Sequence, residues 1–160
     1  MAGKVIPASE AGWVGVEVEG YRPGAPETGV ERHTIVGGRK ADPGEPGPAM
    51  ELRYFELQPG AASRYEKHEH EHYVIVKRGL GHAVVGETVT EIGPNDVIYV
   101  GPLELHQFLN RGDEPFGFYC FVDACRDFSQ QPDEEELARL AASPAGAVAK
   151  PFAVPPPAKR

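Results

Sequence analysis

Short runs of alternating apolar and polar residues dominate the middle of this chain, between residues 49 and 124. Each run is rich in β-branched or aromatic residues and is bounded by turn-forming Gly, Pro, Asn or Asp, which is the pattern of a half-buried β-strand. The runs predict strands over residues 51–57, 63–68, 72–77, 82–85, 88–92, 97–100, 106–110 and 116–122. Strands at this spacing, with no helical period between them, predict an all-β, closed antiparallel architecture.

The segment before this region has a different composition. Residues 1–30 are rich in Gly, Pro and Glu, and Trp13 with the alternating valines up to Val18 is their only strand-like piece. Residues 37–48 are a loop by composition. We therefore expect residues 1–48 to form an extended arm and loop that pack on the barrel of residues 49–124 or on a partner subunit.

One short helix is predicted in the last part of the chain, residues 125–160. Asp133 can cap its N-terminus and Glu136 stands at the third helical position, which is the capping-box arrangement. Pro144 ends the helix. A Pro-rich tail follows over residues 151–160.

Length, charge and cysteine content limit the class of protein. The 160 residues suffice for one domain with a real core, and the formal charge of −8 makes nucleic acid and anionic membranes poor partners. No apolar stretch approaches the ~20 residues that span a bilayer. The N-terminus lacks the apolar core of a signal peptide, so we expect a cytoplasmic protein. Cys120 and Cys125 are expected to be reduced and mainly structural.

Four of the six histidines fall in two patches. His68, His70 and His72 lie in the run Lys-His-Glu-His-Glu-His-Tyr, and His106 follows 34 residues after the last of them. Imidazoles at alternate positions of a strand point to one side of a sheet. Several neutral imidazoles aimed at one volume suit a divalent transition metal, so the sequence predicts a metal site.

At these residues the chain resembles the cupins, a family of small β-barrels. Their first motif, Gly-x5-His-x-His-x3-Glu-x6-Gly, aligns without a gap from Gly60 to Gly79, with Glu and His exchanged between the first and third ligand slots. The second motif, Gly-x5-Pro-x-Gly-x2-His-x3-Asn, matches at His106 and Asn110. It departs from the pattern at its first three fixed positions, which are held by Asn95, Gly101 and Leu103.

The resemblance implies a double-stranded β-helix (a jelly-roll barrel) with one divalent transition metal at its mouth. The implied ligands are three histidines and one glutamate: Glu66, His68, His72 and His106. This set suits Fe, Mn, Ni, Cu, Co or Zn. Small cupins are usually homodimers, so the resemblance also implies a homodimer.

The role of His70 depends on the path of the chain. If the strand runs straight through residues 66–72, then His68, His70 and His72 share one face, and His70 replaces Glu66 as the alternate ligand. If the chain turns at residues 69–71, which the motif glycines favour, His70 faces solvent or an entering substrate. His33 and His82 lie outside the patches and are expected to be structural.

The predicted function is that of a mononuclear metal enzyme acting on a small organic substrate. Dioxygenase-type chemistry and isomerase or lyase chemistry suit the site equally, with Glu66 as ligand or general base. Arg64 shares the predicted ligand face and could bind a substrate carboxylate, although an ion pair with Glu56 would occupy it equally well. Phe108 is expected to line the pocket. The alternative is a non-catalytic metal-binding or ligand-sensing cupin.

Overall fold

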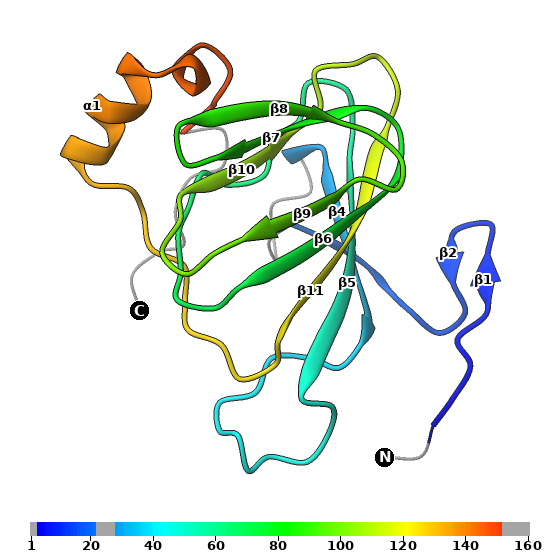
Figure 1. The fold of residues 1–160 in the computed structure, drawn as a ribbon. Helices are drawn as coiled ribbons and strands as arrows, with labels where there is room; N and C mark the ends of the chain where they lie inside the picture. The colour runs from blue at the N-terminus through cyan, green and yellow to red at the C-terminus, as the bar shows by residue number, and fades with distance from the viewer. Residues whose placement is uncertain (1–2, 22–27, 152–160) are drawn as a thin grey trace.

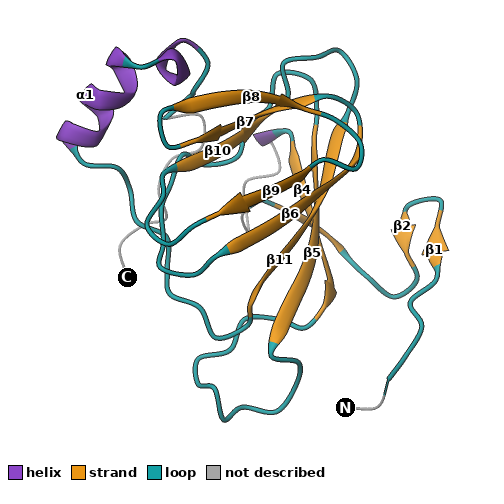
Figure 2. Cartoon of the chain, in the orientation of Figure 1, coloured by secondary structure: helices purple, strands orange, loops and turns teal. Residues whose placement is uncertain are grey.

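The computed structural model describes residues 3–21 and 28–151, which are mainly β-strands (Figures 1 and 2). The strands are β1 (Ala8–Ser9), β2 (Gly12–Trp13), β3 (Val18–Gly20), β4 (Val30–Val36), β5 (Met50–Leu57), β6 (His72–Arg78), β7 (Gly81–Val85), β8 (Thr88–Ile92), β9 (Val97–Val100), β10 (His106–Leu109) and β11 (Phe116–Asp123). A helix, α1 (Glu134–Ala142), and a 3₁₀ turn, η2 (Pro144–Ala147), follow them. Neither helix in the described part of the chain is long and apolar enough to cross a membrane.

Two antiparallel sheets form the body of the molecule. The larger has six strands in the order β3-β4-β5-β11-β6-β9, and the smaller has three in the order β10-β7-β8. Figure 1 shows the smaller sheet packed across the larger one, with α1 beyond its outer side. The core lies between the two sheets and includes Val74 of β6, Phe118 of β11, Ala83 of β7 and Phe108 of β10.

Strict alternation on β6 shows how the sequence positions this core. Val74 and Val76 are buried, whereas Tyr73, which precedes them, and Ile75, which lies between them, are exposed. Successive side chains of a strand point to opposite faces, so this pattern allows one register against the core. The same alternation places His72, at the start of β6, on the inner face.

The capping box predicted for α1 is confirmed. Asp133 Oδ1 accepts a hydrogen bond from the Glu136 amide at 2.8 Å, and Glu136 Oε2 accepts one from the Asp133 amide at 2.9 Å. Leu140 anchors the helix in a second apolar cluster with Val84 and Leu109 on the outer side of the smaller sheet.

Two features differ from the sequence-based expectations. Residues 63–68 do not form a regular strand and make only isolated bridges, such as that of Glu66 with His106. No strand was expected over Val30–Val36, yet β4 pairs with β5 along most of its length. Of the tail expected over residues 151–160, all but residue 151 lies outside the described residues, as do residues 1–2 and 22–27 of the expected arm.

Both glycines that bound the first motif adopt left-handed backbone conformations. Gly60 has φ +80° and Gly79 has φ +71°. A Cβ added at Gly79 would lie 2.3 Å from the Pro115 carbonyl oxygen, whereas one at Gly60 would meet nothing within 4 Å. Gly79 is therefore required both for its backbone angle and for the close approach of another segment.

Candidate metal centre and its pocket

Three histidines converge at one end of the space between the sheets. His72 opens β6, His106 opens β10, and His68 lies just beyond the bridge between Glu66 and His106. One ring nitrogen from each of the three lies within 4.8 Å of those of the other two, and all three residues are buried. Three nitrogens this close can share one cation.

Hydrogen bonds to backbone carbonyls orient two of these rings. His68 Nδ1 lies 2.7 Å from the His70 carbonyl oxygen, and His106 Nδ1 lies 2.9 Å from that of Glu104. A carbonyl oxygen only accepts, so each Nδ1 carries the proton and each Nε2 keeps a free lone pair. His68 Nε2 is buried and has no hydrogen-bond partner among the described residues. Such an orphaned lone pair, held by a bond at the opposite ring nitrogen, is the arrangement of a metal-binding histidine.

Burial also keeps the cluster neutral. It lowers the pKa of His106 to about 4, lowers the pKa of His68, and holds the pKa of His72 well below its usual value. Neutral imidazole is the form that binds metal ions. The residues present therefore fit a divalent transition metal, and His68, His72 and His106 are positioned to hold one.

His70 bends back into the pocket. The chain bends at residues 69–70, but the side chain of His70 is only 9% exposed and its ring stacks on that of His68 at 3.6 Å. Its Nδ1 lies 2.6 Å from Asp127 Oδ1, and its Nε2 lies 3.2 Å from His72 Nε2. Since Nδ1 donates to the carboxylate, Nε2 of a neutral His70 is unprotonated and faces Nε2 of His72 as an acceptor. A role for His70 as the alternate ligand stays a prediction.

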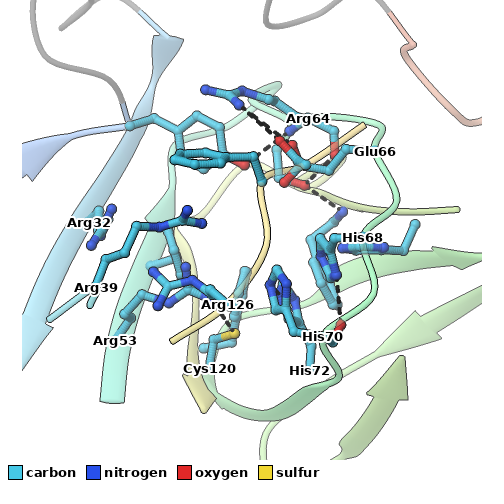
Figure 3. A pocket seen from close by; sticks show the side chains of 18 residues that line it. Arg32, Arg39, Arg53, Arg64, Glu66, His68, His70, His72, Cys120 and Arg126 are labelled. Atoms are coloured by element: carbon cyan, nitrogen blue, oxygen red, sulfur yellow. Dashed lines mark hydrogen bonds and ion pairs between the residues drawn. The ribbon is translucent and has the colours of Figure 1, made fainter. Parts of the chain in front are cut away.

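Glu66 lies at the edge of the histidine cluster. Its carboxylate is 3.6 Å from Arg64 Nη1, and both side chains line the pocket (Figure 3). The alternative partner expected for Arg64, Glu56, pairs instead with Arg78 at 2.6 Å. Glu66 is not one of the three clustered residues, and its role as a ligand or a base stays a prediction.

The pocket beside the histidines has a volume of about 320 Å³. Figure 3 shows the labelled histidines on one side and Arg32, Arg39, Arg53 and Arg126 on the other. Phe108 also lines it and is part of the core as well, and its role in substrate binding stays a prediction. The four arginines are absent from the site expected from the sequence, because they come from separate segments that only the fold brings together.

The remaining histidines and the cysteines lie outside the histidine cluster. His33 is buried against Trp13, and the only ion-pair partner of His82 among the described residues is Glu91, at 4.0 Å. Both cysteines are free thiols, and Cys120 lines the pocket.

Comparison with known proteins gives consistent matches. The cupin domain family model matches residues 53–122. The chain is 39% identical over 139 residues to the 1-methylthio-D-xylulose 5-phosphate methylsulfurylase of Rhodospirillum rubrum, a match that covers 86% of this chain and 85% of that enzyme.

Solved structures match over similar lengths. A cupin-2 domain protein from Rhodospirillum rubrum is 37% identical with a TM-score of 0.74, and the match covers 90% of this chain and 93% of that one. A cupin 2 conserved barrel domain protein from Rhodopseudomonas palustris is 34% identical with a TM-score of 0.73, and the coverage is 88% and 94%. These matches confirm the fold class predicted from the sequence.

Proposed function

Because the chain belongs to the cupin family, we propose that it is a metal-dependent enzyme acting on a small phosphorylated keto sugar that carries a methylthio group. The convergence of His68, His72 and His106 beside an arginine-lined pocket carries this proposal. The substrate class comes from the 39% identical relative, which is named for 1-methylthio-D-xylulose 5-phosphate. The pocket volume of about 320 Å³ is at the small end for ligand sites, which suits a substrate of this size.

The residues of the pocket have separate tasks in this proposal. His68, His72 and His106 would hold the divalent ion, which supplies a Lewis acid for a carbonyl oxygen of the substrate. A carbon next to a polarised carbonyl gains and loses protons readily. Glu66 is the carboxylate among the pocket-lining residues, and it would hold or return that proton while Arg64 keeps it oriented.

Metal content tests the ligand set directly. We expect near-stoichiometric transition metal in protein purified without added metal or chelator, measured by elemental analysis. His72→Ala and His106→Ala should lose it, whereas His82→Ala is the matched control and should keep it, because His82 lies outside the cluster. Equal metal content in all of these proteins would contradict the site.

The Glu66→Gln variant distinguishes between two roles of Glu66, that of a proton carrier and that of a metal ligand. If Glu66 carries a proton, the variant keeps its metal and kcat falls by about 10²- to 10⁴-fold, the usual contribution of general acid–base catalysis. Loss of metal together with activity would make Glu66 a ligand instead.

Turnover tests the reaction. The metal-loaded protein is incubated with 1-methylthio-D-xylulose 5-phosphate and a small thiol, which also keeps Cys120 and Cys125 free. The thiol sulfur takes the methylthio group as a mixed disulfide while the sugar carbon takes a proton, and both products are followed by mass spectrometry. We expect the reaction to proceed equally with and without oxygen. A strict need for oxygen would favour dioxygenase chemistry, and metal binding without turnover would overturn the proposal of an enzyme.

A further inference from the structure

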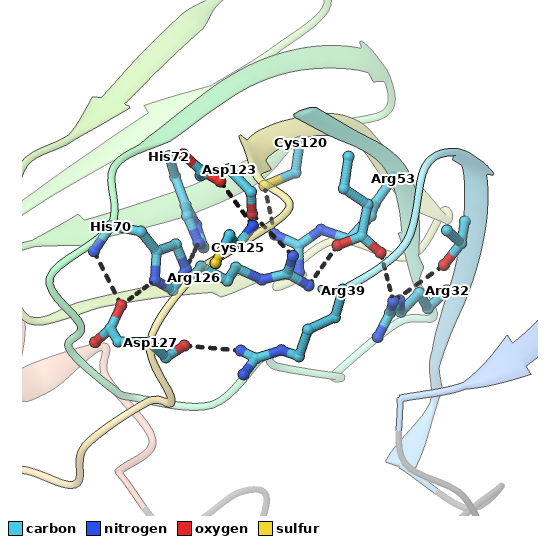
Figure 4. Close-up of polar contacts among 12 residues, drawn as sticks. Arg32, Arg39, Arg53, His70, His72, Cys120, Asp123, Cys125, Arg126 and Asp127 are labelled. Atoms are coloured by element: carbon cyan, nitrogen blue, oxygen red, sulfur yellow. Dashed lines mark hydrogen bonds and ion pairs between the residues drawn. The ribbon is translucent and has the colours of Figure 1, made fainter. Parts of the chain in front are cut away.

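Four arginines gather around one buried carboxylate at the end of the pocket opposite the histidines (Figure 4). Glu51 of β5 is fully buried; it pairs with Arg32 of β4 at 2.9 Å and with Arg126, which follows β11. Arg53 lies two residues along β5 and is therefore on the same inner face. Arg39 reaches the group from the loop that follows β4.

The cluster has more positive than negative charge. Glu51 compensates one of the four guanidinium groups, and the half-exposed Glu19 lies 3.7 Å from Arg32 Nε, so two positive charges remain. The carboxylate of Asp127 is engaged by the ring of His70 and by the amides of Glu69 and His70. Arg39 donates to the backbone oxygen of Asp127 at 2.7 Å and lies over the ring of Phe128 at 4.1 Å, and neither contact supplies a negative charge. Buried charges without a counter-charge are costly, so this end of the pocket is prepared for an anion.

Arg53 has donors available to such an anion. Among the described residues its guanidinium has one hydrogen-bond partner, Cys120 Sγ at 3.1 Å, and its buried Nε has none. The side chain is held in place, because Arg53 stands opposite Cys120 in the pairing of β5 with β11 and is only 8% exposed. The excess positive charge also affects Arg126. Burial and the proximity of Arg53 lower the pKa of Arg126 to about 10.

We propose that Arg53 and Arg39, with Arg126 behind them, bind the phosphate group of a phosphomonoester whose other end lies at the histidine cluster. This inference rests on the proposed function and deepens it, because it assigns the group that orients the substrate. A phosphate dianion matches the surplus charge, and its oxygens can accept paired N–H bonds from the planar fork of arginine. A singly charged carboxylate would leave more of the surplus uncompensated.

Calorimetric titration of the metal-loaded protein with inorganic phosphate tests the site. We expect saturable binding by the wild type. Arg53→Gln and the exposed, fold-tolerant Arg39→Gln should each raise the Kd by about 10- to 100-fold, since each removes hydrogen bonds to a charged group. Arg139→Gln on the exposed surface of α1 makes the same change of charge outside the pocket and should leave the Kd unchanged.

The outcomes separate this inference from the proposed function. No saturable phosphate binding, or an unchanged Kd in both pocket variants, overturns the phosphate site even if the substrate is turned over. Weakened phosphate binding in these variants, with metal content kept, supports the site even if 1-methylthio-D-xylulose 5-phosphate is not consumed. With turnover, a raised KM for the phosphorylated substrate in Arg39→Gln supports it further.

Discussion

Glu51→Gln is the sharpest test of the charge balance in the pocket. The carboxylate is fully buried and pairs with both Arg32 and Arg126. The substitution keeps the shape of the side chain but removes its charge, and it turns one acceptor oxygen into a donor beside a guanidinium. Breaking a buried ion pair by removing one partner typically costs about 3–5 kcal/mol. We expect a loss of this size in the free energy of unfolding.

Urea unfolding, followed by circular dichroism, measures the loss. With an m-value of about 2 kcal/mol/M, the transition midpoint should fall by roughly 1.5–2.5 M. Glu135→Gln is the matched control, because it removes an exposed ion pair with Arg139 on α1, a pair worth about 0.3–0.5 kcal/mol. Added phosphate should restore more stability to the Glu51 variant than to the wild type, since the variant has one more unmatched positive charge. Equal midpoints for the two variants, in the absence of phosphate, would refute the reasoning.

Two further predictions concern the frame of the site. Gly79→Ala should destabilise the protein by more than Gly60→Ala, because both residues have positive φ but only the Cβ at Gly79 would meet backbone, at 2.3 Å; similar thermal midpoints for the two variants would contradict this. Asn110→Ala should lower the unfolding free energy by about 3 kcal/mol, since the fully buried amide donates to two backbone carbonyls and accepts from one amide. A change of less than about 1 kcal/mol in urea unfolding would show that water replaces these bonds.

The regular part of the barrel could be predicted from the sequence because its strands are short runs rich in β-branched and aromatic residues, bounded by turn-forming residues. The expected strands at 88–92 and 97–100 match β8 and β9, and the others of this kind differ from β5, β6, β7, β10 and β11 by one residue at an end. The strand predicted over residues 63–68 was wrong, because this backbone pairs only at isolated bridges. Pairing with a distant strand is a tertiary property that the local sequence does not encode. β4 was missed because its burial depends on β5, a neighbour beyond a long loop.

The candidate site could be predicted only in part, because only some of its residues lie close together in the sequence. Four histidines in two patches are visible in the sequence, whereas the arginines come from β4, β5, a loop and the segment after β11. One local signal was available: Glu51 and Arg53 stand in phase with Phe55 and Leu57, the apolar face of β5. Charged residues at core positions of a strand indicate a buried polar site.

The contacts of the neighbouring residues Arg126 and Asp127 limit where the chain of this fold can become longer or shorter. Arg126 reaches Glu51 on one side of the pocket, while its neighbour Asp127 reaches His70 on the other (Figure 4). A single inserted residue here would shift one of the two out of reach. The loop over residues 41–47 makes most of its hydrogen bonds within itself or to Lys40. Insertions and deletions among natural variants should therefore accumulate in that loop and be absent between Arg126 and Asp127.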